Sequence, residues 1–124
     1  MKILALNKKA SFDYQVLETF ETGIVLFGHE VKSLRLGQMN LKGSYVSLKT
    51  NKKGNSEAYL MASHLPLYKF AGEVDSYQPD RPRKLLLKKK QIDYLMGKKQ
   101  EKGLTVIPIK VYTKGSFIKL EIAI

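Results

Sequence analysis

The feature that most constrains the fold is a strict alternation of residue types at the end of the chain. Every second residue between positions 118 and 124 is a branched aliphatic one, namely Ile118, Leu120, Ile122 and Ile124. Successive side chains of a strand point to opposite faces, so this pattern predicts a strand over Phe117–Ile124 with one buried face. An apolar segment over Leu104–Tyr112 precedes it, and the turn residues 113–116 separate the two. The sequence therefore predicts a closing β-hairpin.

Pro108 lies inside the first strand of this hairpin. Proline has no backbone N–H to donate to a neighbouring strand, so Pro108 predicts either an edge position or a bulge.

Other short apolar segments predict a mainly β domain. The predicted strands cover residues 12–20, 24–27, 44–49 and 58–61, with a weaker candidate at 68–74. Thr22-Gly23 predicts a turn before the buried strand Ile24–Phe27, and the polar residues Asn51–Asn55 predict a hairpin connection. Several short strands interrupted by helices favour a small antiparallel barrel, closed or nearly closed, because closure hides the sheet edges.

A short helix is predicted over Glu30–Leu36, within the glycine-bracketed segment Gly28–Val46. Val31 and Leu34 lie three residues apart and share an apolar face, whereas Lys32 and Arg35 share a cationic one. Gly37 is placed where a glycine commonly ends a helix.

A second helical pattern covers Lys88–Lys102, with an apolar face formed by Ile92, Leu95 and Met96. Gly103 predicts the end of this pattern, and Gly97 predicts a division into two short helices. The expected total is about three short helices.

The charge of the chain points to a polyanionic partner. Lysine and arginine number 22 against 11 acidic residues, a net charge of +11 at pH 7. The segment Arg81–Lys90 (RPRKLLLKKK) is the densest cationic run. Cations that meet phosphates release counterions and so gain free energy. A lysine-rich surface that is merely solvated is the alternative to this interpretation.

The residue types and their spacing give little support for a catalytic site or a metal site. The chain has no cysteine, which excludes a disulfide framework, a thiolate metal site and a cysteine nucleophile. His29 and His64 lie far apart without ligand spacing, and no phosphate-binding glycine loop is present. No apolar run approaches the roughly 18 residues of a membrane span. We expect a protein that is not an enzyme, with no cofactor, no metal and no membrane contact.

Several motifs together resemble one protein family. The segment from Gly28 reads G-x-E-V-K-S-L-R-x-G and continues with N-L and S-Y-V. Further matching blocks, in the same order along the chain, are Asn7–Ala10, Arg83–Leu87, Thr105–Pro108 and Tyr112–Gly115. The chain is thereby similar to the SsrA-binding proteins, also called small protein B.

This resemblance implies a fold and an architecture. It implies an oligonucleotide-binding-like β-barrel with helices packed at its ends, forming a single RNA-binding domain over residues 1–124. The family continues with a basic C-terminal tail that is absent from this chain.

The resemblance also implies a function. Such a protein binds the tRNA-like domain of transfer-messenger RNA (SsrA RNA) and delivers it to stalled ribosomes for trans-translation, which comprises ribosome rescue and peptide tagging. It acts as a non-catalytic, monomeric adaptor in the cytoplasm. Its partners are transfer-messenger RNA and the ribosome, and indirectly elongation factor Tu and alanyl-tRNA synthetase. Recognition is expected through shape, phosphates and 2′-hydroxyls.

The candidate RNA-binding residues combine cations with a few polar and apolar groups. They are Asn7, Lys8, Lys9, Glu21, Lys32, Arg35, Asn40, Arg83, Lys84, Leu86, Lys88 and Lys89. The resemblance assigns Asn7–Lys9, Glu21 and Leu86–Lys88 to transfer-messenger RNA. Glu21 repels phosphates, yet a carboxylate can accept hydrogen bonds from base amino groups or 2′-hydroxyls.

Leu85, Leu86 and Leu87 cannot all point inward in one regular element, and the resemblance makes Leu86 the exposed one. Lys88 stands where the family often has histidine or asparagine; it keeps a donor but loses a planar group. For Tyr45, Tyr94 and Tyr112, core packing is favoured over stacking on bases.

Two other functions fit the composition. A general single-strand-binding module predicts several exposed aromatic residues on one sheet face. A basic ribosomal structural protein predicts no affinity for an isolated tRNA-like fold. Composition and periodicity do not separate the three, and the family resemblance favours the first.

Overall fold

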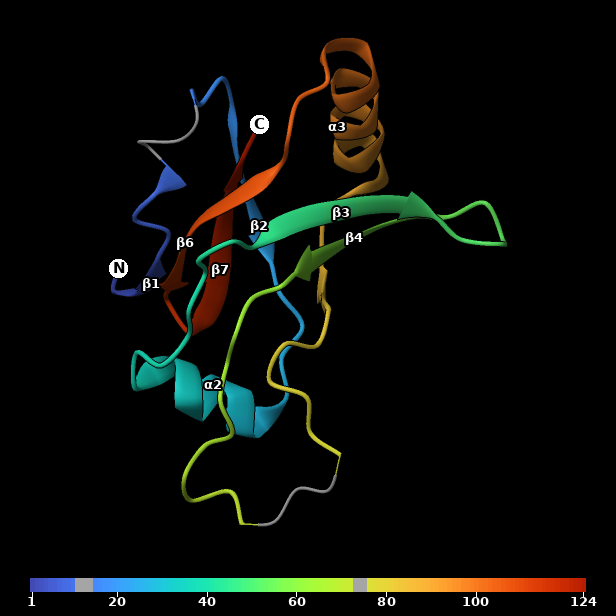
Figure 1. Ribbon diagram of the computed structural model, residues 1–124. Coiled ribbons are helices and arrows are strands. Elements are labelled where there is room, and N and C mark those ends of the chain that lie inside the picture. The colour runs from blue at the N-terminus through green and yellow to red at the C-terminus, as the bar shows by residue number, and fades with distance from the viewer. Residues whose placement is uncertain (11–14, 73–75) are drawn as a thin grey trace.

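The computed structural model describes residues 1–10, 15–72 and 76–124. Its elements are mainly strands, as predicted, and all pairings between them are antiparallel (Figure 1). The strands are β1 (Ile3–Leu6), β2 (Thr19–Gly23), β3 (Tyr45–Thr50), β4 (Ser56–Met61), β5 (Arg83–Leu85), β6 (Ile107–Lys114) and β7 (Phe117–Ala123). The described helices are α2 (Gly28–Arg35) and α3 (Lys89–Lys102).

The closing hairpin is confirmed. Strands β6 and β7 pair along their length, and Leu120 and Ile122 of β7 are fully buried. The register shifts between Pro108 and Lys110, so the proline is accommodated by a bulge. It does not mark an edge, because β6 lies between β1 and β7.

The first sheet has the order β1-β6-β7-β2, and its N-terminal part differs from prediction. Strand β1 was not predicted, and β2 begins only at Thr19; residues 11–14 of the predicted first strand lie outside the described residues. The predicted turn at Thr22-Gly23 is wrong, because both residues pair with β7.

The predicted buried strand over Ile24–Phe27 is wrong as well. Within it only Ile24 forms an isolated bridge, to Leu85, and Val25 and Phe27 are exposed. The four consecutive apolar residues of this segment still alternate, with Ile24 and Leu26 packed against the core. The four consecutive apolar residues predicted a strand that is buried on both faces, but one face of this segment is exposed.

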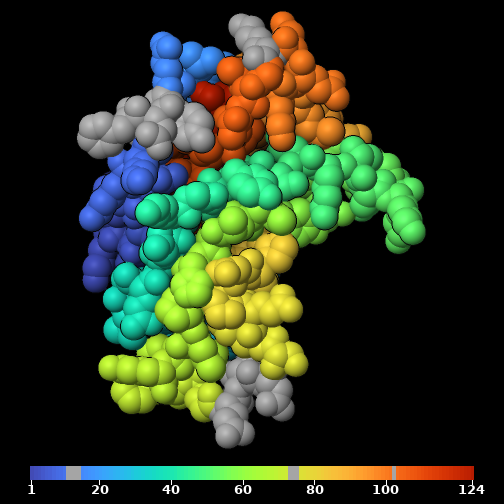
Figure 2. All heavy atoms as spheres, in the orientation of Figure 1, coloured from blue at the N-terminus to red at the C-terminus, as the bar shows by residue number. Residues whose placement is uncertain are grey.

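The second sheet has the order β3-β4-β5. Strands β3 and β4 form the predicted hairpin, whose tip contains Gly54 with a positive φ of 81°. The tip stands out from the body of the molecule in both views (Figures 1 and 2). The weaker strand candidate is absent from residues 68–72, and residues 73–74 lie outside the described residues.

The sheets do not close into a barrel, which corrects the prediction. One seam consists of the Ile24–Leu85 bridge and two flanking backbone hydrogen bonds, Val25 N–H to Lys84 and Leu86 N–H to Gly23. At the other seam the N–H of Val46 in β3 donates to the carbonyl of Val106, just before β6, at 2.9 Å. These few hydrogen bonds connect the two sheets, but the strands do not form the continuous hydrogen-bonded ring of a barrel.

Helix α2 ends as predicted, with Gly37 at a φ of +74° directly after its last turn. Helix α3 continues through Gly97 and ends at Gly103, which adopts a left-handed conformation with φ +63°. The division at Gly97 was therefore wrong, and the described residues contain the two helices α2 and α3.

Side chains of both sheets and both helices meet in one main hydrophobic core, with Leu34 of α2 and Leu95 of α3 fully buried. No helix of the described residues is both long and apolar enough to cross a membrane.

Candidate nucleic-acid interface

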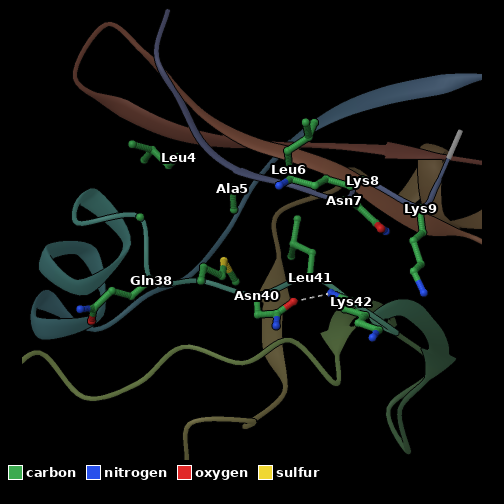
Figure 3. Close-up of a pocket in the computed structure, with 12 residues that line it drawn as sticks. Leu4, Ala5, Leu6, Asn7, Lys8, Lys9, Gln38, Asn40, Leu41 and Lys42 are labelled. Carbon is green, nitrogen blue, oxygen red and sulfur yellow. Dashed lines mark hydrogen bonds between the residues drawn. The ribbon is translucent and has the colours of Figure 1, made fainter.

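A groove between the end of β1 and residues 37–42 brings together several predicted RNA-binding residues (Figure 3). Its volume is about 590 Å³, and Asn7, Lys8 and Lys9 line one side. Asn40 and Lys42 line the other side. Both lysines after Asn7 are exposed, as is Lys42, so the groove presents cations from two elements that lie far apart in sequence.

The two asparagines of this groove are held in place by the backbone. The Asn7 side-chain amide donates to the carbonyl of Pro108 at 2.9 Å, and its backbone N–H donates to Ile109 at 2.8 Å. Asn40 exchanges backbone hydrogen bonds with His64, and its Oδ1 accepts from the N–H of Lys42 at 2.9 Å (Figure 3). These hydrogen bonds hold in place the two backbone segments that form the sides of the groove and carry its lysines.

A second hollow of about 420 Å³ continues the groove, because Asn7, Lys9 and Lys42 line both. Tyr45 at the start of β3 also lines it, and this side chain is 45% exposed. The preference for core packing was therefore wrong for Tyr45 and for Tyr94, which is also exposed, and it is confirmed for the buried Tyr112. Neither Tyr45 nor Lys42 was among the predicted site residues. The sequence favoured core packing over base stacking for Tyr45, and the only signal for Lys42 was its place in the glycine-bracketed segment Gly28–Val46.

Glu21 lies on β2, on the outer face of the first sheet. Its carboxylate accepts a hydrogen bond from the Tyr112 hydroxyl and one from the Lys114 ammonium at 3.1 Å. The Tyr112 hydrogen bond, followed by that of Lys114, lowers the pKa of Glu21 below its ordinary value. Burial and the hydrogen bond to Glu21 raise the pKa of Tyr112 to about 12. Glu21 is thus a charged carboxylate at neutral pH that orients a lysine not predicted from the sequence.

Shallow hollows connect the surroundings of Glu21 with those of Asn7. The hollow around Glu21 is lined also by Glu121, and the same Glu121 lines a neighbouring hollow with Asn7 and Lys8. The predicted residues at the two ends of this sheet therefore share one face of the molecule.

Leu86 lies beside the end of β2. Its side chain is 59% exposed, as predicted for one of the three leucines, whereas Leu85 is buried. Its backbone N–H donates to Gly23 at 3.0 Å, two residues from Glu21. A Cβ on Gly23 would lie only 3.1 Å from Leu86 Cδ1, so the glycine allows this close approach. The structure thereby brings Leu86 near Glu21.

The lysines that flank Leu86 are exposed on both sides. Lys84 is exposed on β5, between two buried residues of that strand. Lys88 precedes α3, where its backbone N–H donates to Gln91 at 3.0 Å, and Lys89 is the first residue of the helix. Both are exposed. Cations thus extend from β5 to the start of α3.

Lys32 and Arg35 are exposed on the outer face of α2, as their spacing predicted. The Lys32 ammonium lies 5.8 Å from the ring centroid of Tyr68. These two cations belong to a different element from the groove and from Leu86.

Arg83 is the exception among the predicted residues, because its side chain is fully buried. Its guanidinium donates to Glu30 at 2.8 and 3.0 Å, to the Ser63 hydroxyl at 2.9 Å and to the Pro79 carbonyl at 2.9 Å. A side chain with no exposed surface cannot reach a phosphate in this conformation, so Arg83 belongs to the core.

Glu30, also fully buried, is the centre of this network. It accepts hydrogen bonds from Arg81, Arg83, the Tyr77 hydroxyl and the backbone N–H of Phe27. Burial alone would raise its pKa, but the hydrogen bonds from Arg81, the Phe27 N–H and Arg83 outweigh that effect and hold the pKa at about 2.

The described residues contain no group of three or more His, Cys, Asp or Glu side chains arranged to hold a metal ion. What they offer is a set of exposed cations, oriented polar groups and the exposed side chain of Leu86. This arrangement suits the binding of a folded nucleic acid. The cations would contact its phosphates, and the polar groups and the leucine would contact its exposed bases.

Comparisons with known proteins agree with this chemistry. The family model described as "SmpB protein" matches residues 4–124. An SsrA-binding protein of Shouchella clausii is 49% identical over 99% of this chain and 75% of its own length. That of Persephonella marina is 48% identical over 100% and 78%. A chain in a structure described as "tmRNA-SmpB: a journey to the center of the bacterial ribosome" superposes with a TM-score of 0.71 at 38% identity, over 94% of this chain and 78% of that one.

Proposed function

We propose that this chain, which belongs to the SmpB family, binds the tRNA-like domain of transfer-messenger RNA and delivers it to stalled ribosomes for trans-translation. The observation that carries the proposal is the shared surface that extends from the Asn7–Lys9 groove past Glu21 to Leu86. It occurs in a chain of net charge +11 that matches SsrA-binding proteins along its whole length.

Each part of this surface has a distinct role in the proposed complex. Lys8, Lys9 and Lys42 neutralise phosphates in the groove and release counterions. Glu21 accepts from a 2′-hydroxyl or a base amino group while it holds Lys114 toward the neighbouring phosphate. Leu86 packs on a ribose or an unstacked base. Recognition then depends on the shape of a folded RNA more than on its base sequence.

The proposal extends to the wider role that the family resemblance implies. The protein acts as a non-catalytic, monomeric adaptor in the cytoplasm, one domain over residues 1–124, and works with elongation factor Tu and alanyl-tRNA synthetase through the RNA it carries. Lys32 and Arg35 of α2 are available for a second contact, with ribosomal RNA.

The test is a titration of the chain against the labelled tRNA-like domain of transfer-messenger RNA. A duplex RNA and an unstructured single strand of equal charge serve as competitors, at low and at raised salt concentration. Tight binding that resists both competitors is the expected result. Equal and steeply salt-dependent binding to all three RNAs would show a nonspecific polycation and would refute the proposal.

Glu21→Ala tests the assignment at residue level. We expect weaker binding of the tRNA-like domain with an unchanged fold, because Tyr112 and Lys114 lose the acceptor that orients them. Glu57→Ala is the matched control, since Glu57 also accepts a hydrogen bond from a tyrosine hydroxyl, that of Tyr59. If both variants bind alike, Glu21 has no specific role.

A further inference from the structure

Three exposed apolar side chains form a strip beside the proposed RNA surface. Val25, Phe27 and Leu86 are 43%, 51% and 59% exposed. Single exposed apolar residues are ordinary, but neighbouring ones on a rigid support indicate an interaction site. Only Leu86 of this strip has a role in the proposed function.

The strip is continuous because two backbone segments run side by side. Ile24 forms an antiparallel bridge with Leu85 of β5, and the N–H of Val25 donates to the Lys84 carbonyl at 2.9 Å. The N–H of Leu86 donates to Gly23 at 3.0 Å. Alternation along residues 24–27 turns Ile24 and Leu26 to the core and leaves Val25 and Phe27 outside.

Phe27 is held by the buried network around Glu30. The Phe27 N–H donates to Glu30 Oε1 at 2.8 Å, and the Arg81 guanidinium bonded to the same carboxylate lies 4.1 Å from the centroid of the Phe27 ring. One face of the ring is thus backed by a guanidinium that is itself fixed, while half of the side chain stays exposed. An aromatic ring prepared in this way loses little conformational entropy when a partner stacks on it.

The charges around the strip identify the kind of partner. Lys84 and Lys88 are exposed beside it, and Arg81 lies at its Phe27 end. Glu30, the carboxylate that contacts Phe27 and Arg81, is buried and bonded to two guanidinium groups, so it does not repel an anion at the surface. An aromatic ring flanked by cations suits a base joined to a phosphate backbone.

We propose that Phe27 is a stacking site for one unstacked nucleobase of the bound RNA, continuous with Leu86, and that Lys84 contacts the phosphate of that nucleotide. The inference rests on the proposed function, since it requires a bound RNA. It adds a base-contacting residue that neither charge nor the family motifs indicated.

The test uses the fact that the chain contains no tryptophan. Phe27→Trp places a single indole on the strip, and excitation at the red edge avoids the tyrosines. Phe70→Trp is the matched control, because Phe70 is 73% exposed and also has a cation, Lys69, over its ring at 4.9 Å. We expect the labelled tRNA-like domain to quench the indole at position 27 and to leave the one at 70 unchanged, since stacked bases quench tryptophan emission.

Affinity gives the second measurement. Phe27→Ala should weaken binding of the tRNA-like domain by about five- to 140-fold, the range for one base stacked on an aromatic ring, with the salt slope unchanged. Phe27→Tyr should retain the affinity, and Phe70→Ala should match the wild type. Circular dichroism checks that each variant is folded.

The outcomes separate this inference from the proposed function. Absence of RNA binding by the wild-type chain overturns both. Wild-type binding with no quenching at position 27, or with unchanged affinity of Phe27→Ala, overturns the stacking site alone and leaves the strip to a protein partner. Quenching confined to position 27 together with the loss of affinity supports it.

Discussion

Replacing Glu30 by glutamine should strongly destabilise the fold, and the structure sets the size of the effect. Glu30→Gln keeps the shape but removes the negative charge that faces Arg81 and the fully buried Arg83. Removing one partner of a buried ion pair costs about 3–5 kcal/mol, because the remaining charge stays buried without compensation. Small domains have total stabilities of about 5–15 kcal/mol, so a large share would be lost.

The lowered pKa of Glu30 expresses the same interaction as a dependence of stability on pH. It lies at about 2, against an ordinary value of 4.5. At about 1.36 kcal/mol per pKa unit, this difference of about 2.5 units corresponds to about 3 kcal/mol of stability in the charged state. Because the folded-state pKa is the lower one, this stability is complete above pH 4.5 and is lost as the pH falls toward about 2.

Equilibrium unfolding in urea measures both effects. At neutral pH the midpoint of Glu30→Gln should fall by roughly 1–5 M, given a loss of about 3–5 kcal/mol and an m-value of about 1–3 kcal/mol per M. The difference from the wild type should shrink as the pH approaches about 2, where the protonated Glu30 resembles glutamine.

Glu101→Gln, on the exposed end of α3, serves as the control and should change stability by no more than about 0.5 kcal/mol. A loss below about 1 kcal/mol for Glu30→Gln, or a difference from the wild type that does not depend on pH, would refute the reasoning.

Three further predictions concern the interface. Leu86→Ala should weaken binding of the tRNA-like domain while the urea midpoint stays near that of the wild type, because the side chain is largely exposed. Gly23→Ala should also weaken binding, since its Cβ would meet Leu86 at 3.1 Å, whereas Gly28→Ala has nothing within 4 Å and should not. Lys42→Ala should reduce the slope of log K against log salt by about 1 if it contacts a phosphate, and the exposed Lys53→Ala at the hairpin tip should leave it unchanged.

Local patterns predicted the parts of the fold in which neighbours in sequence are also neighbours in space. The alternation after Phe117 defined β7, and Gly37 and Gly103 marked helix ends because a left-handed residue follows each helix. Strand β1 was missed because four residues carry little periodicity, and its formation depends on pairing with β6, about a hundred positions away. Closure of the barrel likewise depends on contacts between segments far apart in sequence.

The sequence predicted which types of residue form the candidate site, but not which of these residues lie close together. Charge identified Lys8 and Lys9, yet nothing in the sequence placed Lys42 across a groove from them. Similarly, Lys114 reaches Glu21 from a strand more than ninety residues later. Such pairs arise from sheet order, which a single sequence does not specify.

Arg83 was predicted from its charge to bind RNA at the surface, but the two-residue period of its strand places it in the core. In Arg83-Lys84-Leu85 the alternation of β5 puts residues 83 and 85 on the same face. Once Leu85 is assigned to the core, Arg83 must be buried with it, and a buried guanidinium requires a carboxylate. Glu30, the one acidic residue of the motif G-x-E-V-K-S-L-R, supplies that carboxylate and at the same time binds Arg81 and the Phe27 N–H. Two motifs about fifty residues apart in the chain are therefore coupled by one ion pair, which supports the surface on which Phe27, Lys84 and Leu86 are displayed.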